Sequence, residues 1–278
     1  MLAAFRTDWA KQWRRPLTFI GLGLLVLIPI IFVVATKANP PGRPEEFRDA
    51  GDAFNFYGTK TGLFLGVSAL ANTSRFLLVI VLAIFAGTAV ASEANWGNLR
   101  ALLVRPIPRG RLLTAKLTTA TLLGVIAAAL VVLTGTIGGI LAFGWHPLTD
   151  GSIHQSAPNI VGNLALGTLY VFWSLSPVIA IGFMVSTLTD SASGAVFAAF
   201  GFYVVSTILD AITQLPSWFR VALPTHYLDA WQKLFPSGRH NGSGPTADML
   251  RGTLLPIAYV LVFLGFAWWW FRRKDILS

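Results

Sequence analysis

Long apolar stretches without charge make up most of this chain, and charged residues are confined to the segments between them. Six windows contain no Asp, Glu, Lys or Arg: residues 17–36, 76–92, 117–149, 151–189, 191–209 and 253–271. A helix that crosses the hydrocarbon of a bilayer needs roughly 20 mainly apolar residues, within a range of about 17–25. The pattern therefore predicts an all-α polytopic membrane protein with six spans.

The six spans are expected within one transmembrane domain that covers residues 1–278. We place them at residues 17–36, 73–92, 117–143, 164–187, 193–212 and 253–271. Two glycine pairs, Gly62 with Gly66 and Gly135 with Gly139, have the four-residue spacing that lets membrane helices approach closely. That spacing is common by chance, so each pair alone is a weak indication of packing.

The distribution of basic residues sets the orientation. With the amino terminus inside, the predicted cytoplasmic segments hold 12 of the 21 Lys and Arg in 52 residues, whereas the outer segments hold 8 in 96 residues. An excess of positive charge is expected on the cytoplasmic side. We therefore expect a multi-pass protein of the cell membrane with both termini in the cytoplasm.

A short apolar run at 63–70 precedes the second span. Counted as a span of its own, it would invert the orientation of everything downstream, but eight residues of helix cannot cross about 30 Å of hydrocarbon. We interpret it as a re-entrant piece or as an outward extension of the second span.

Two segments outside the spans have amphipathic patterns. In residues 2–15, Phe5, Trp9 and Trp13 recur every four residues among basic residues, which predicts an interfacial helix along the cytoplasmic headgroups; a tail that serves only topology is the alternative. In the outer loop 213–252, apolar residues between 227 and 235 have helical spacing and predict a short helix on the outer face.

Composition narrows the function classes. Charged residues make up 12% of the chain and hydrophobic residues 54%, and there is no Cys, so disulfides and thiolate metal sites are excluded. The net charge of +9 lies in short pieces between apolar spans, which indicates a role at the membrane surface rather than nucleic-acid binding.

Residues for catalysis or ion coupling are scarce in the spans. Gly58–Thr61 lacks the ending and the setting of a phosphate-binding loop, and the four His are expected in solvated outer loops, so we predict no catalytic residue and no metal site. Asp210 and Glu93, near the ends of spans, are the best candidates for ionisable groups in a pathway. Any energy for transport is expected from another protein.

The segment between the second and third spans is the most informative one. It reads Glu93-Ala-Asn-Trp96-Gly97-Asn-Leu99-Arg100-Ala-Leu-Leu103-Val-Arg-Pro106-Ile-Pro-Arg109. Its tryptophan and leucines form an apolar stripe, which predicts a short amphipathic helix under the membrane that ends at the prolines. A basic loop that serves topology alone is the bland alternative.

This segment resembles the permease subunits of ABC-2 type ATP-binding-cassette transporters over residues 87–116. The resemblance implies that the segment is a coupling helix, which docks on a separate cytosolic ATPase. It assigns docking to roughly Glu93–Pro106, and the positions that match the family pattern are Glu93, Gly97, Arg100, Pro106 and Arg109. The apolar residues Trp96, Leu99 and Leu103 complete the candidate docking surface. It also implies two ATPase copies that carry ATP and Mg, a second six-span permease that is identical or paralogous, and no cofactor in this chain.

The expected function is thus the membrane subunit of an ATP-driven exporter, which is not itself an enzyme. The alternative is an integral-membrane enzyme or assembly factor that acts on lipid-linked substrates. Hydroxyl groups and aromatic rings in the spans favour a hydrophobic or amphipathic cargo, such as an antibiotic, a peptide or a lipid. Thr88, Ser174, Ser176 and Asp210 are the candidates for lining a pathway, although such residues also simply pack membrane helices.

Overall fold

The computed structural model describes residues 2–42, 50–95, 109–151, 153–236, 242 and 244–273. This part of the chain is mostly helical, with one small hairpin. Its elements are α1 (Leu2–Gln12), α2 (Pro16–Ala38), α3 (Ala50–Lys60), α4 (Leu63–Ser74), α5 (Leu77–Asn95), α7 (Arg109–Phe143), β1 (Leu148–Asp150), β2 (Ile153–Gln155), α8 (Ala157–Ser174), α9 (Ser176–Leu188), α10 (Ala192–Ala211), α11 (Ser217–Val221), the 3-10 helix η1 (Ala230–Leu234) and α12 (Ala247–Arg273).

Five helices in the described ranges are long and apolar enough to cross a membrane. They are Pro16–Ala38, Gly110–Phe143, Ala157–Leu188, Ala192–Ala211 and Ala247–Arg273. Only 17% of the most apolar window of the last of these helices is buried inside the protein. Water does not favour so much exposed apolar surface, whereas a bilayer does, and the chain is therefore a membrane protein.

The second predicted span differs from a single straight helix. Leu63–Ser74 and Leu77–Gly87 form a pair that is bent by 58° at a short break. The span expected at 73–92 therefore begins inside α4, and its first residues belong to a separate helix. The pair makes a sixth apolar unit only when its two helices are counted as one broken span.

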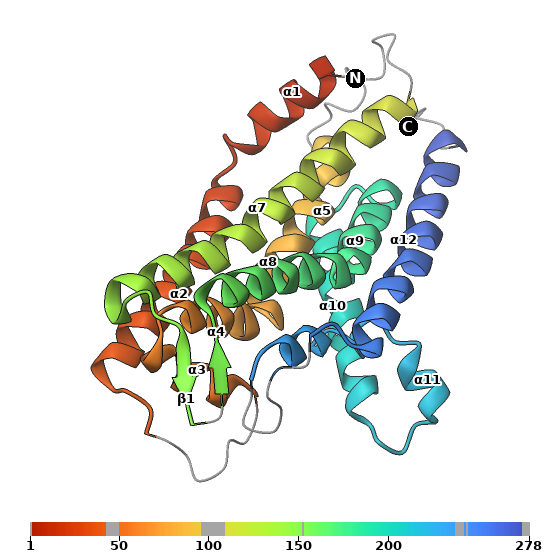
Figure 1. Ribbon diagram of the computed structural model, residues 1–278. Coiled ribbons are helices and arrows are strands. Elements are labelled where there is room, and N and C mark those ends of the chain that lie inside the picture. Colours follow the sequence, from red (N-terminus) through yellow and green to blue (C-terminus); the bar gives the residue numbers. More distant parts are fainter. Residues whose placement is uncertain are drawn as a thin grey trace.

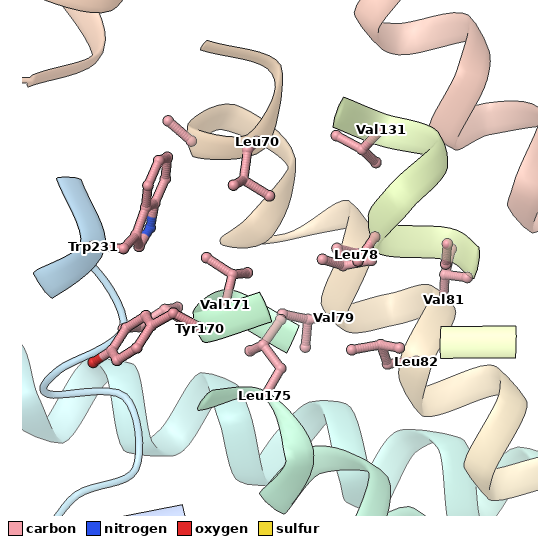
Figure 2. Close-up of a cluster of buried hydrophobic side chains, with 14 of the residues drawn as sticks. Leu70, Leu78, Val79, Val81, Leu82, Val131, Tyr170, Val171, Leu175 and Trp231 are labelled. Atoms are coloured by element: carbon pink, nitrogen blue, oxygen red, sulfur yellow. The ribbon is translucent and has the colours of Figure 1, made fainter. Parts of the chain in front are cut away.

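Buried side chains from α4, α5, α7, α8 and η1 form the part of the core that Figure 2 shows. Figure 2 shows Leu70 of α4 and Leu78 of α5 near Val131 of α7, with Val171 of α8 beside them and Trp231 of η1 at the edge of the cluster. All five side chains are fully buried. The core therefore joins the bent pair α4–α5 to α7, α8 and η1.

The two glycine pairs seen in the sequence pack against each other. Gly62 directly precedes α4 and lies against Gly139 of α7. Gly66, in the first turn of α4, lies against Thr136 of α7. A side-chain carbon at any of these glycines would collide with its neighbour. The expectation of close helix packing is confirmed, and it holds α4 against α7.

Some small elements lie where the hydrophobic pattern predicts none. α3 packs beside α4, and Leu148 of β1 pairs with Gln155 of β2 in a hairpin whose turn includes Gly151 at a φ of 59°. The hairpin corrects the purely α-helical expectation. The short helix expected near 227–235 is present as η1, and its Trp231 and Leu234 are fully buried.

The elements gather at two ends of the molecule. α1, the start of α7 and the end of α12 lie together at the top of Figure 1, whereas α3, the hairpin and α11 lie at the bottom. The helices α2, α7, α8 and α12 run between these ends. The last turn of α5 and the first turn of α7 also lie at the end that carries α1.

Candidate functional site

Most of the predicted docking residues lie outside the described residues. They are Trp96, Gly97, Leu99, Arg100, Leu103 and Pro106. The two residues that flank them are placed: Glu93 lies in the last turn of α5, and Arg109 begins α7. The structure therefore describes the two helix ends that flank the predicted docking segment.

A buried cluster of charges lies at these two helix ends. We define the Lys116 cluster as Asp8 and Lys11 of α1, Glu93 of α5 and Lys116 of α7. Lys116 Nζ lies 2.6 Å from Glu93 Oε2 and 3.3 Å from Asp8 Oδ1, and it donates a hydrogen bond of 2.9 Å to the carbonyl of Ala89. Lys11 Nζ lies 3.2 Å from the other Glu93 oxygen.

The Lys116 cluster is buried and electrically balanced. The side chains of Lys116, Glu93 and Asp8 are 2%, 5% and 8% exposed, whereas Lys11 reaches the surface. Two ammonium groups face two carboxylates: Lys116 donates hydrogen bonds to Asp8 Oδ1 and to the Ala89 carbonyl, and it forms an ion pair with Glu93. Burying charges costs free energy unless they are paired in this way, so each member depends on the others.

Charge interactions shift the pKa of Glu93, which lies one residue beyond the predicted span. Burial raises the pKa of this carboxyl, but the neighbouring Lys116 and then Lys11 lower it by more, so the pKa lies below its ordinary value. Glu93 is therefore held as a carboxylate at neutral pH, which keeps the pair with Lys116 ionic.

The cluster fixes the amphipathic helix α1 on the protein. Asp8 and Gln12 on one face of α1 are buried, and Arg15 after it donates hydrogen bonds to Ser92 Oγ at 2.9 Å and to the carbonyl of Thr88 at 3.5 Å. The expected stripe of rings is present, since Phe5, Trp9 and Trp13 follow one another with centroids 5.9 Å apart. However, part of the polar face of α1 points into the protein rather than into water.

A second contact between helices lies beside the cluster, and no pattern in the sequence predicts it. The Ser186 hydroxyl of α9 accepts hydrogen bonds from the backbone N–H groups of Val90 and Ala91 in α5, at 3.0 and 2.8 Å. All three residues are buried. The last two turns of α5 are thus held from one side by α9 and from the other by Lys116.

The four residues expected to line a pathway lie in separate surroundings. Thr88 donates a hydrogen bond to the Ile84 carbonyl of its own helix. Ser174 and Ser176 flank the break between α8 and α9, where Ser174 borders a cavity of about 10 Å³, which is room for one water at most. Asp210 lies near the end of α10, in an ion cluster of its own. The structure does not join the four into one lining.

Asp210 pairs with His226, which the sequence pattern assigned to a solvated loop. His226 Nδ1 lies 2.6 Å from Asp210 Oδ1, and Arg220 Nε donates a hydrogen bond of 2.9 Å to the Asp210 carbonyl. His226 is only 26% exposed, so it is half-buried and tied to α10 rather than fully solvated. In the described part of the chain, no group of three or more His, Cys, Asp and Glu side chains could hold a metal ion.

Comparisons with known proteins identify the family. The chain is 29% identical over 216 residues to the protein named "Uncharacterized protein YhcI" of Bacillus subtilis (strain 168), and this match covers 74% of the chain and 65% of that relative. The chain thus spans less than two thirds of the relative's length. Residues 52–277 match the family described as "Protein of unknown function (DUF2705)". Because the match covers most of the chain, including the Lys116 cluster residues of α5 and α7, the protein belongs to the DUF2705 family.

Proposed function

We propose that this chain is the membrane subunit of an ATP-driven transporter of the ABC-2 type. It would export a hydrophobic or amphipathic compound, such as an antibiotic, a peptide or a lipid. Two copies of a cytosolic ATPase would supply the energy, with ATP and Mg bound to them, and a second six-span permease would complete the pathway.

The Lys116 cluster is the observation that best supports this proposal. It joins α1, α5 and α7 at the two ends of segment 96–108, where the sequence resembles a coupling helix. Because its charges are buried and paired, separating these three helices costs several kcal/mol. A push on the segment would therefore move the three helices as one body, which is what transmission from a docked ATPase requires.

The proposed topology counts the bent pair α4–α5 as one span. Together with α2, α7, α8–α9, α10 and α12 this gives six spans, with both termini in the cytoplasm of a cell membrane. α1 and segment 96–108 would then lie on the cytoplasmic side, and α3, the hairpin, α11 and η1 on the outer side. The density of basic residues is nearly threefold higher in the predicted cytoplasmic segments than in the outer segments, which supports this orientation.

ATP would act by making the ATPases bind one of two conformations of the permease more tightly than the other. The ATPases would come together when ATP is bound, and the docked segments would favour the state of the permease that fits the closed pair. The membrane helices would contribute no nucleotide site and no ion coupling, which agrees with the few ionisable residues in the spans.

Association with a partner ATPase tests the proposal. The full chain, isolated from its native membranes in mild detergent, should retain a protein that contains Gly-x-x-x-x-Gly-Lys-Ser/Thr and that hydrolyses ATP. Arg100→Glu should lower this association and transport in reconstituted vesicles at least tenfold while membrane insertion is unchanged. Glu93→Ala should also lower transport, but it opens the buried Lys116 cluster, so Arg100 gives the sharper test.

Lys233→Glu is the matched charge reversal, since Lys233 lies in η1 at the opposite end of the molecule. It should leave ATPase association at the wild-type level. Equal association for wild type and Arg100→Glu would reject the assigned interface, and a chain that is active with no ATPase bound would reject the transporter proposal itself. Mass measurement in detergent would test the second permease, which an active complex with a single permease contradicts.

A further inference from the structure

The last two turns of α12 border a cavity at the end of the molecule that carries α1. The cavity has a volume of about 310 Å³ and is lined by Gly265, Trp268, Trp269, Arg272 and Arg273. We call it the α12 cavity. Its volume lies at the lower end of the range for small-molecule sites, roughly 300–1,000 Å³.

The lining residues form one stripe along the helix. The other four residues follow Gly265 by three, four, seven and eight positions, which places all five on the same face of α12. Ala267 and Phe271, on another face, are buried in the protein. Gly265 lines the cavity without a side chain and leaves it open at that position, because a side-chain carbon built there meets no atom within 4 Å. The helix is therefore anchored by one face and leaves the other concave.

Charge and aromatic rings meet in the α12 cavity. The Arg273 guanidinium lies 4.5 Å from the centroid of the Trp269 ring, which is a cation–π contact. A guanidinium that stacks by its face keeps its N–H groups in its own plane, where they can bind a phosphate by two hydrogen bonds. Arg272 is exposed beside it, so the site carries two positive charges.

The surroundings place the α12 cavity at the level of lipid headgroups. Exposed Leu261, Val262 and Phe266 continue the outer surface of α12 towards the other end, as lipid-facing residues do, and tryptophans near a helix end are typical of the interface. Arg6, Arg14 and Arg111, at the same end of the molecule, are exposed as well. The positive charge of these arginines attracts anions at the bilayer surface towards the cavity.

We propose that the α12 cavity binds the phosphate of an anionic glycerophospholipid. The phosphate contacts the two arginines, the glycerol lies against Trp269 above Gly265, and the acyl chains follow the exposed apolar surface of α12. The proposal requires only that the chain spans a membrane with this end at a headgroup layer; it does not depend on the proposed transport function.

Lipid binding to the purified full chain tests the proposal. Native mass spectrometry of the delipidated protein, titrated with phosphatidylglycerol or phosphatidylcholine, should give an apparent Kd at least tenfold lower for phosphatidylglycerol. The double variant Arg272→Gln/Arg273→Gln and the single variant Gly265→Leu should each remove this preference. The second variant places a side chain in the cavity without changing any charge.

Matched controls separate the site from general effects on the helix. Trp269→Leu should weaken phosphatidylglycerol binding about tenfold, whereas Trp270→Leu, at an exposed neighbour outside the lining, should not. Gly201→Leu, at an equally open glycine of α10, should retain the preference that Gly265→Leu removes. Equal binding of both lipids by the wild type, or an unchanged preference in the cavity variants, would overturn the proposal.

A third arm distinguishes lipid phosphate from soluble phosphate. Inorganic phosphate at a concentration of several millimolar should displace little phosphatidylglycerol, because the soluble ion makes no contact with Trp269 or with the apolar surface. Complete displacement at that concentration, with the same loss in Arg272→Gln/Arg273→Gln, would assign the cavity to a soluble phosphate compound and reject the lipid.

Discussion

The backbone of Gly62, just before α4, lies directly against the backbone of Gly139 in α7. A side-chain carbon at either position would collide with the other residue's carbonyl oxygen. The contact continues beyond the two glycines, because the Gly62 N–H donates a hydrogen bond of 3.1 Å to the Gly144 carbonyl and the Thr61 hydroxyl donates one of 2.7 Å to the His146 carbonyl. The bent pair α4–α5 is thus fixed to α7 by backbone contact.

Gly139→Ala is expected to destabilise the protein because the backbones of α4 and α7 must move apart. Overpacking of this kind costs about 1–3 kcal/mol and occasionally more. The free energy of unfolding, measured by denaturant titration in detergent micelles, should fall by that amount. Gly201→Ala is the matched control: it lies in α10 with open space around it, and alanine is the better helix former, so stability should not fall. Equal effects at both positions would contradict the packing.

The sequence predicted that these glycines allow close packing but not which helices they join. Spacing of four residues places two glycines on one face of a helix, and the partner face depends on the tertiary arrangement. The same limit applies to Lys116. In the sequence it is only the last charge before an apolar window, and nothing in the pattern indicates its partners, whereas the structure buries it between Asp8, which lies 108 residues away, and Glu93.

Hydropathy located the long helices well because lipid imposes a length and an apolar composition on each span. It located the short elements poorly. α3 and the hairpin have no such constraint, and the break at residues 75–76 has no proline or glycine to mark it. η1 was found because its buried aromatic and leucine residues keep a helical spacing even in a connection.

Lys116→Met should destabilise the protein strongly, since it leaves the carboxylates of Asp8 and Glu93 buried without their main partner. Removing one member of a buried ion pair costs about 3–5 kcal/mol. The free energy of unfolding in detergent is the measurement. Lys233→Met is the control, because its pair with Asp248, at 2.6 Å, has side chains 41% and 39% exposed, and such surface pairs contribute about 0–1 kcal/mol.

The double variant Glu93→Gln/Lys116→Met tests whether these two residues act as a unit. Because one change removes the charge that the other leaves unpaired, the two losses should not add. We expect a coupling free energy of about 1–3 kcal/mol from the double-mutant cycle. Additive losses would mean that each side chain is stabilised independently, and they would contradict the ion pair of 2.6 Å between the two residues.

Trp231→Ala should loosen the connection 212–236 from α8. The Trp231 side chain is fully buried, and its ring packs against Phe54 in a tilted contact and against Phe235 in an edge contact, at centroid distances of 6.3 and 6.0 Å. Truncating a buried tryptophan costs about 3–5 kcal/mol. Limited proteolysis should show faster cleavage in 212–236 for this variant. Trp218→Ala, at a 73% exposed tryptophan of α11, should leave the cleavage rate and stability unchanged.

The contribution of Glu93 to stability should depend on pH in a defined window. Its folded pKa lies below the ordinary value of about 4.5, because the attraction of Lys116 and Lys11 outweighs the effect of burial. A carboxyl with a depressed folded pKa stabilises the protein fully above its unfolded pKa, and this stability is lost as the pH falls through the folded value. The difference in unfolding free energy between wild type and Glu93→Gln should therefore be constant from pH 7 to about pH 5.5 and shrink below about pH 4.5.

Asp248→Asn provides the control for this pH dependence. Asp248 accepts a hydrogen bond from Lys233, but the pair is exposed, and solvent screening limits its contribution to about 1 kcal/mol at most. Unfolding monitored by tryptophan fluorescence between pH 3.5 and 7 should therefore show a small difference between wild type and Asp248→Asn at every pH. A difference for Glu93→Gln that grows as the pH falls below 4.5 would mean that Glu93 is protonated in the folded protein, and the ionic pair with Lys116 would then be wrong.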